Sequence, residues 1–230
     1  MNAIPPMPVN WQEQKIYIGN VNKLGANNLI AEILAATPHS AFHYVLGCII
    51  EKLIEENYVL GLEENPTIPR VAWATRNAME LRVLSKYVCQ SETNLKRFQN
   101  DVLGSGTTTV RSMTRLLNDL AKEVGFPVVS EDAYRNQGEL QSAREEAGLG
   151  EATCLLASAC AKKVGLYKEY FALSGVTSPL VHASAISVLK TFDLEAYRET
   201  VTIHGLLLTS KVITEARDHI ALHGFKSARP

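Results

Sequence analysis

Apolar residues recur at helical spacing along most of this chain. Between Ser40, a predicted N-cap, and about Leu60 they form one stripe on a predicted helix. The stripe consists of Phe42, Leu46, Ile49, Ile50, Leu53 and Ile54. No run bounded by turn signals alternates strictly between apolar and polar residues, as a half-buried strand would. The pattern therefore predicts an all-α protein.

Capping residues and prolines indicate where the other helices begin and end. Asn10, with Glu13 three residues later, resembles a capping box and predicts the start of a short helix. Pro69 fits the first turn of a helix, Asp193 an N-cap and Gly224 a helix end. Helices are predicted over residues 29–36, 40–60, 70–90, 91–103, 130–147, 151–164, 166–173 and 193–223. Breaks are predicted at residues 25–28, 104–106 and 175–179.

The last of these breaks lies in an unusual stretch, residues 171–189, which contains no Asp, Glu, Lys or Arg but includes His182 and several serines. A segment without charge is expected to be buried, and buried polar groups need hydrogen-bond partners. Ser178 followed by Pro179 fits an N-cap and a first helical position. We therefore expect two helical pieces here and a polar constellation inside the fold.

Length and composition favour one globular unit. The chain has 230 residues, of which 46% are apolar and 20% charged, as in an ordinary globular protein. We expect a single helical domain over residues 1–230, a bundle of about seven helices with long antiparallel members. Residues 1–9 are expected to form an extended arm and residues 225–230 a flexible basic tail.

Charge and cysteine usage narrow the compartment and the partners. A formal net charge of −1 gives no overall attraction to nucleic acid or to an anionic membrane, although a local patch for RNA stays open. The four cysteines include no C-x2-C pair, which fits free thiols in a reducing cytosol. No signal peptide is visible, and the long uncharged stretches, residues 33–50 and 171–189, contain proline, serine and histidine. We expect a cytoplasmic protein without a membrane span.

Arg76 and Glu80 are the first candidate binding residues. They are four residues apart, so they share one side of the predicted helix over residues 70–90, together with Trp73 and Tyr87. An arginine and a glutamate beside a tryptophan suggest ions held against packed neighbours. The alternative is an exposed ion pair that contributes only about 0.3–0.5 kcal/mol.

Tyr170, Ser174, His182 and Ser184 are the second group of candidates. Tyr170 and Ser174 share one helix side, and His182 and Ser184 fall in the first turns after the predicted break. Hydroxyls and an imidazole near free helix-end N–H groups can bind an anion or a phosphate. The same groups can instead satisfy one another in a buried structural network.

The order Arg76-x3-Glu80, Tyr170-x3-Ser174 and His182-x-Ser184 resembles an uncharacterised bacterial all-helical family, a domain of unknown function. The resemblance covers about residues 70–189. It implies a helical architecture and a shared polar cluster, but the family has no assigned reaction.

The end of the chain resembles a second family, the HEPN ribonucleases, through Arg217 and His223 in the segment RDHIALH. Those proteins are all-helical dimers that need no metal. The resemblance implies that His223 acts in acid–base chemistry and that Arg217 stabilises the phosphate. The alternative is that cationic side chains simply favour the negative end of a helix dipole.

Other motifs indicate no cofactor and no metal. The segment Gly104–Thr109 lacks the lysine and the strand context of a P-loop. His39 and His43 are four apart but have no acidic or cysteine partner at matching spacing, so no metal site is expected.

Two functional hypotheses follow. The first is a helical binding or interaction module for a small molecule or an anion; the second is a HEPN-like ribonuclease in a toxin or phage-defence setting, with RNA as its partner. A purely structural role for the polar cluster stays open. A homodimer is expected through apolar residues of the last helix, namely Leu206, Leu207, Leu208, Val212, Ile213 and Ile220. The testable contact is a hydrogen bond from His182 or Tyr170 to Arg76 or Glu80.

Overall fold

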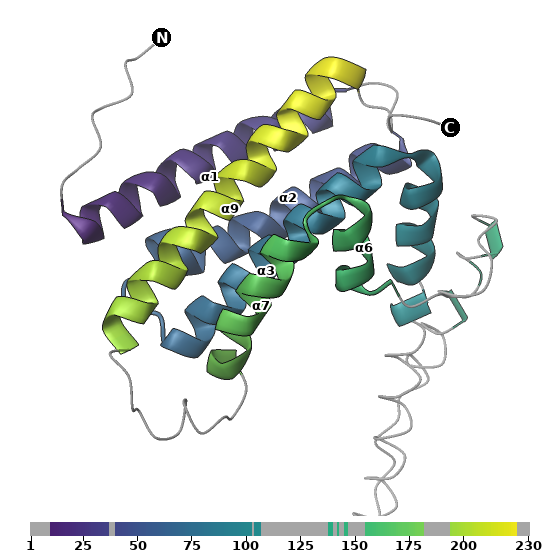
Figure 1. The fold of residues 1–230 in the computed structure, drawn as a ribbon. Helices are drawn as coiled ribbons and strands as arrows, with labels where there is room; N and C mark the ends of the chain where they lie inside the picture. Colours follow the sequence, from purple (N-terminus) through teal and green to yellow (C-terminus); the bar gives the residue numbers. More distant parts are fainter. Residues whose placement is uncertain are drawn as a thin grey trace, which may run out of the picture. The chain divides into compact units, whose positions relative to one another are not determined.

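The protein is an all-α multi-helix bundle, here seen in a computed structural model that describes residues 10–36, 40–102, 104–106, 138–139, 142, 145–146, 155–181 and 194–224. None of these residues lies in a strand. The helices are α1 (Trp11–Ala35), α2 (Ala41–Asn57), the π-helix η1 (Tyr58–Leu62), α3 (Ile68–Gln90), α6 (Ala157–Lys163), α7 (Tyr167–Val181) and α9 (Leu194–His223), drawn in Figure 1.

The chain divides into two compact units, which we describe separately. The first unit comprises Met1–Ser91 and Ala157–Arg229, and it contains all the helices named above. In the second unit, Glu92–Leu156, residues 92–102 and 104–106 are helical. All the sites discussed below belong to the first unit.

Helices α3 and α9 pack against each other at the centre of the first unit; α3 also contacts α2, α6, α7 and η1, and α9 also contacts α1, α2 and η1. Asn22 and Gly25 of α1 meet Leu206 and Ile213 of α9 in the same order along the chain, so α1 and α9 run parallel, side by side (Figure 1). The contacts of α3 with α9 also follow this order. The expected antiparallel pairs are α1 with α2 and α3 with α7.

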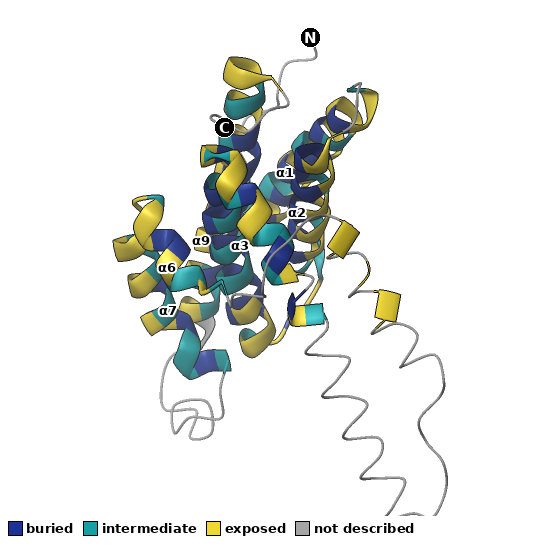
Figure 2. Cartoon of the chain, turned by 90° about the vertical axis from the view of Figure 1, so that its right-hand side faces the viewer, coloured by how far each residue is buried: buried dark blue, intermediate teal, exposed yellow. Residues whose placement is uncertain are grey.

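The core lies where α1, α2, α3 and α9 meet, and Figure 2 shows buried positions along the sides that these helices turn to one another. The predicted stripe of α2 is confirmed, since five of its six apolar residues are buried, namely Phe42, Leu46, Ile49, Ile50 and Leu53. The largest fully buried side chains of the other helices include Leu29, Tyr87, Leu206 and Leu208. Burial of apolar surface at about 25 cal/mol per Å² makes this region the main source of stability.

Local capping follows the sequence closely. The Asn10 side chain accepts hydrogen bonds from the backbone of Gln12 and Glu13 at the start of α1. Ser40 caps α2 in a capping box with His43, whose Nδ1 accepts from the Ser40 backbone at 2.9 Å. His43 therefore helps to cap the N-terminus of its own helix, α2. Gly224, with a φ of 63°, ends α9 as predicted.

The three predicted breaks are wrong, because the glycines and the proline concerned lie within helices. Helix α1 is not short but continues through Gly25, where a Cβ would lie 3.4 Å from the Ile213 side chain of α9. Gly104–Gly106 are helical. Helix α7 continues through Gly175 and includes Pro179. Pro179 removes one hydrogen bond to the carbonyl of Gly175, but Gly175 is exposed, so water can satisfy that carbonyl.

The π-helix η1 crosses α1 at a close approach of the two backbones. A Cβ on Gly61 would lie 2.7 Å from the Cα of Gly19, so α1 and η1 touch through glycine. Asn57 donates to the Gly19 carbonyl at 2.8 Å, and Glu63 N–H donates to the Tyr58 carbonyl at 2.8 Å to close the wider turn. This turn carries Tyr58 to the surface, where its side chain is 53% exposed.

Some predictions lie outside the described residues. They concern the arm over residues 1–9, His39, Leu103, Cys154, His182, Ser184, Asp193, most of the helix over residues 130–147, and the tail over residues 225–230. Helix α6 begins at Ala157, and residues 155–156 before it are not helical, although the sequence predicted a helix from residue 151.

Candidate functional site

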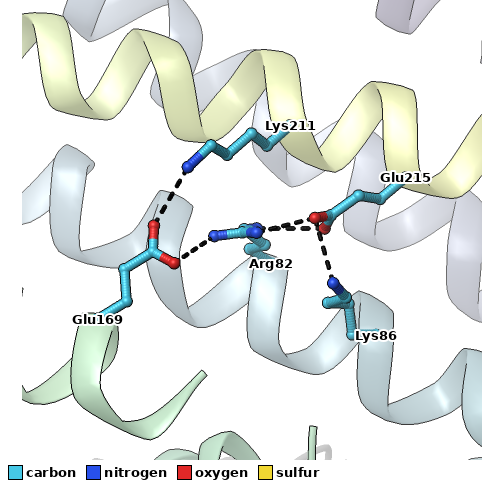
Figure 3. A network of polar contacts seen from close by, with 5 residues as sticks. All are labelled: Arg82, Lys86, Glu169, Lys211 and Glu215. Atoms are coloured by element: carbon cyan, nitrogen blue, oxygen red, sulfur yellow. Dashed lines mark hydrogen bonds and ion pairs between the residues drawn. The ribbon is translucent and has the colours of Figure 1, made fainter. Parts of the chain in front are cut away.

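One buried arginine joins three helices. Arg82 of α3 donates two hydrogen bonds to Glu215 of α9, from Nε at 3.1 Å and from Nη2 at 2.8 Å, and one to Glu169 of α7 at 2.8 Å. Lys86 lies 3.2 Å from Glu215, and Lys211 lies 3.4 Å from Glu169. Figure 3 shows these five side chains, which we call the ion cluster, with the guanidinium between the two carboxylates.

The carboxylates of the ion cluster are held in their ionised form. Burial alone would raise the pKa of Glu169 and of Glu215, but hydrogen bonds and charge from Arg82, assisted by the neighbouring lysines, lower the pKa of both. Burial likewise opposes the charge of Arg82, and its bonds to the two glutamates outweigh that effect and raise its pKa. The cluster is therefore charged at neutral pH.

The ion cluster has one positive charge in excess, because three cations face two carboxylates. Arg82 is the buried member, with 7% of its side chain exposed, whereas the side chain of Lys211 is 52% exposed. Lys211 also makes the longest contact, so it is the member that can most easily turn toward another anion. Glu169 would keep its bond to Arg82 at 2.8 Å if Lys211 turned away.

A hollow of about 270 Å³ lies between α7 and α9. Both helices contact α3, and Arg82 of α3 bonds to a glutamate on each of them. We call this hollow the α7–α9 groove. Its lining consists of Glu169, Ala172, Leu173, Val176, Thr200, Val201, His204 and Leu208. Lys211 follows Leu208 by three residues on the same side of α9. The lining is mostly apolar, and Glu169 is the member of the ion cluster that belongs to it.

A second hollow, of about 250 Å³, is lined in part by Glu215 of the ion cluster. Its lining consists of Ser85, Lys86, Cys89, Gln90, Val164, Glu215 and His219. A cysteine and a histidine in one hollow would suggest nucleophilic catalysis if the thiol ionised easily. Burial, however, raises the pKa of Cys89 to about 12, so the group is a thiol and not a thiolate at neutral pH.

A third hollow, of about 550 Å³, lies on the opposite side of α3, between α3, α2 and η1. Its lining consists of Lys52, Ile54, Glu55, Glu56, Tyr58, Val59, Arg70 and Trp73. Trp73 is 51% exposed, which is high for tryptophan.

The predicted residues on α3 lie on this outer side. Arg76 Nε and Glu80 Oε1 form an ion pair at 3.1 Å, with 28% and 31% of their side chains exposed. Trp73 and Tyr87 share one broad side of α3 but differ in burial, since Trp73 is half-exposed and Tyr87 is buried. Fourteen residues place their side chains only about 40° apart around the helix axis, and Lys163 of α6 lies over the Tyr87 ring at 5.6 Å.

The predicted residues on α7 are partly buried. Tyr170 and Ser174 lie on the flank of α7 away from the α7–α9 groove. Among the described residues, Tyr170 has no hydrogen bond to Arg76 or Glu80. The structure therefore does not make the expected contact through Tyr170, and His182 and Ser184 lie outside the described residues.

Arg217 and His223 face different neighbours. Arg217 donates to the Gly25 carbonyl of α1 at 3.2 Å. The His223 ring lies 4.9 Å from that of His219, which packs on Phe42 of α2 at 5.6 Å. Neither Arg217 nor His223 lines any of the three hollows.

The sequence analysis missed Arg82, Glu169 and Glu215, although one signal was present. Arg82 continues a helical series of small and apolar residues, Val71, Thr75, Ala78 and Ser85, all of which are buried. A charged residue within such a series predicts a buried ion that needs partners. Nothing in the sequence pairs it with Glu215, 133 residues away.

Across the part of the chain that is described, no helix is long and apolar enough to cross a membrane. The same residues contain no group of three or more His, Cys, Asp or Glu side chains that would hold a metal ion. Comparison of the chain with family models, with curated proteins and with solved structures finds no match. The function must therefore be argued from the geometry of the hollows and the ion cluster.

Proposed function

We propose that the protein is a binding module that takes a small amphipathic carboxylate in the α7–α9 groove. The observation that supports this most directly is the junction of an apolar groove with an ion cluster carrying one positive charge in excess. Ligand sites are commonly concave, mostly apolar and fitted with a few polar groups that fix orientation. The groove has this composition.

In the proposed complex the ligand's apolar body lies against Leu173, Val176 and Leu208. Its carboxylate meets Lys211, which lies outside the lining but 3.4 Å from the lining residue Glu169. Lys211 is suited to this role because it is exposed and loosely paired. Arg82 continues to hold Glu169, so that binding leaves no carboxylate without a partner. The proposal keeps the expectation of a small anionic ligand and moves its site to the other flank of α7 from Tyr170 and Ser174.

The remaining expectations stay proposals. Arg76 and Glu80 are a surface ion pair, and a role for them with His182 and Ser184 in a family-wide polar cluster rests on the sequence resemblance alone. The HEPN-like ribonuclease, with Arg217 and His223, is the weaker alternative because no described hollow contains either residue. A cytosolic location remains proposed, supported by the free thiols of Cys48, Cys89 and Cys160.

The test is titration of the full chain with octanoate, octanol and acetate, followed by calorimetry and by NMR shifts in α7 and α9. Octanoate is expected to bind most tightly, since it has both an apolar body and a charge. Lys211→Gln is expected to weaken octanoate about tenfold, because a hydrogen bond to a charged group contributes about 1.5 kcal/mol. The same change should leave octanol unaffected.

Two further variants locate the binding. Ala172→Leu extends a side chain into the groove and is expected to abolish binding of octanoate and octanol alike. Lys23→Gln removes an exposed lysine from α1 and serves as the matched charge control. If octanoate does not bind, or binds equally well to the Lys211 and Ala172 variants, the proposal is wrong.

A further inference from the structure

A tight turn joins α6 to α7 and brings the end of one helix beside the start of the other (Figure 1). Leu166 N–H donates to the Ala161 carbonyl at 2.8 Å. Gly165, with a φ of 74°, donates to the Lys162 carbonyl at 3.3 Å. Glycine takes this left-handed conformation readily, and the two bonds satisfy carbonyls at the end of α6. The turn therefore holds the lysines at the end of α6 next to the first turn of α7.

Two aromatic rings lie exposed at the start of α7. Tyr167 and Phe171 are four residues apart and 37% and 67% exposed, and their ring centroids are 6.0 Å apart. Gly175 follows Phe171 by one turn on the same side of α7. A Cβ on Gly175 would meet no atom within 4 Å, so the surface beside the Phe171 ring is open there. A flat group can therefore lie against this ring.

Three lysines lie near these rings, and their charges are not neutralised. Lys162, Lys163 and Lys168 are all exposed, and in the part of the chain that is described no ion pair involves any of them. Lys162 Nζ lies 4.8 Å from the centroid of the Tyr167 ring. We call the cations and rings that lie closest together the α6–α7 surface, namely Lys162, Tyr167, Lys168 and Phe171.

The one carboxylate of α7 does not neutralise this surface. Glu169 is bonded to Arg82 at 2.8 Å and to Lys211 at 3.4 Å. Its side chain lies about 160° around the helix axis from that of Phe171, since each residue turns the helix by about 100°. The α6–α7 surface therefore combines unpaired positive charge with exposed aromatic rings, unlike the ion pairs at the third hollow.

We propose that the α6–α7 surface binds single-stranded nucleic acid. A single strand alternates charged phosphates with flat bases, and proteins bind it with cations placed beside aromatic rings on which the bases stack. Lys162 and Lys168 would meet phosphates, and a base would stack on Phe171. The attraction is local, because the net charge of the chain is −1.

The position of Lys162 favours this partner over an anionic membrane. Aromatic side chains that dock on a bilayer insert their rings below the headgroups. With Lys162 Nζ only 4.8 Å from the Tyr167 centroid, insertion of this ring would draw the ammonium group toward the apolar region at a cost. Beside a stacked base the same ammonium group meets a phosphate and stays hydrated.

Helix α9, in contrast, does not provide the partner surface that the sequence suggested. Homodimer formation was predicted through its apolar residues, but most of these are buried in the chain's own core, namely Leu206, Leu208, Val212 and Ile213. Of that group, Leu207 is 48% exposed. A single exposed leucine does not make an interface core. The homodimer stays a prediction without a contact face on α9.

Fluorescence anisotropy tests the proposal, with labelled oligouridylate and oligothymidylate titrated with the full chain at several salt concentrations. Both strands are expected to bind, and the tighter of the two complexes identifies RNA or DNA as the source. Lys162→Gln and Lys168→Gln should each reduce the slope of log affinity against log salt by about 0.7. Phe171→Ala should weaken binding about tenfold at fixed salt, because a stacked base is lost.

Matched controls come from exposed residues outside the α6–α7 surface. Lys23→Gln removes an exposed lysine from α1, and Tyr44→Ala removes an aromatic ring that is 74% exposed on α2. Both variants should bind like the unchanged chain, and circular dichroism checks that every variant keeps its helical fold. Ultraviolet cross-linking of oligouridylate followed by mass spectrometry needs no variant and should label Tyr167 or Phe171.

Three results would overturn the proposal. The first is that neither strand binds, or that both bind the surface variants as well as the unchanged chain. The second is that duplex DNA or polyglutamate competes as well as a single strand, which would indicate attraction by charge alone. The third is binding to phosphatidylserine vesicles in place of the oligonucleotides, which would assign the surface to a membrane. None of these results bears on octanoate binding.

Discussion

The two sides of α3 hold their charges in different ways. On the outer side, Arg76 and Glu80 are four residues apart and about one-third exposed. On the inner side, Arg82 is buried and its partners, Glu169 and Glu215, come from two other helices. An exposed helical pair contributes little, because water screens it and both side chains lose freedom. A buried arginine cannot lose its partners without a large penalty.

The largest expected effect on stability comes from removing the arginine on the inner side of α3, and removal of the arginine on the outer side is the comparison. Arg82→Ala should lower the free energy of unfolding by about 3 kcal/mol, because two partly buried carboxylates lose their main partner. Arg76→Ala is expected to lower it by only about 0.3–0.5 kcal/mol. Urea denaturation of both variants, monitored by circular dichroism, measures the difference.

A triple variant separates the loss of charge pairing from the loss of packing. Arg82→Met together with Glu169→Gln and Glu215→Gln removes the buried charges as a group. It should be clearly more stable than Arg82→Ala, since no carboxylate is left without a cation. If Arg82→Ala and Arg76→Ala destabilise the chain equally, the contrast between the two sides of α3 does not hold.

Much of the helical framework was predictable, because caps and apolar stripes act over a few residues. Asn10, Ser40 and Gly224 each mark the end of a helix as expected. The breaks at Gly25 and at Gly175–Pro179 were not predictable in the same way. Whether glycine interrupts a helix depends on what packs against it, and Ile213, which lies near Gly25, comes from the other end of the chain.

The same distinction applies to the candidate site. The ion pair between Arg76 and Glu80 follows from a spacing of four residues on one helix. The partnership of Arg82 with Glu215 depends on how α9 packs beside α3, and no local pattern encodes it. The sequence indicates that Arg82 is out of place among buried residues, but not which residues bond to it.

Acid is expected to lower the free energy of unfolding by a moderate amount. The folded state lowers the pKa of Glu169 and of Glu215 below the ordinary value of 4.5, so both carboxylates stabilise the fold above that pH. This contribution should be lost as the pH falls below 4.5 and through the lowered folded-state values. Urea denaturation from neutral pH into this range should therefore show a steep loss of stability.

The triple variant is the control for that pH dependence, because it has no carboxylate at either position. Its stability should fall less steeply over the same pH range than that of the unchanged chain. Equal slopes for the two proteins would mean that other carboxylates cause the loss, and that the inner side of α3 does not dominate the acid response.

The smallest expected effect is a difference in the rates at which two cysteines react, and it involves no change in stability. Cys48 of α2 is exposed, whereas Cys89 lines the second hollow and its pKa is raised to about 12 by burial. Since the thiolate is the reactive form, iodoacetamide at mildly alkaline pH should modify Cys48 first and Cys89 far more slowly. Mass spectrometry of peptides measures both rates, with guanidinium-unfolded protein as the control for intrinsic reactivity.

The same labelling reports on the ion cluster when it is repeated in the two arginine variants. Glu215 both lines the hollow that contains Cys89 and bonds to Arg82, so loss of the cluster should let α3 and α9 separate more often. Cys89 is therefore expected to react faster in Arg82→Ala than in the unchanged chain, and at an unchanged rate in Arg76→Ala. Faster labelling in both variants would mean that the two sides of α3 are coupled, and slow labelling in both would mean that α3 and α9 stay together without the cluster.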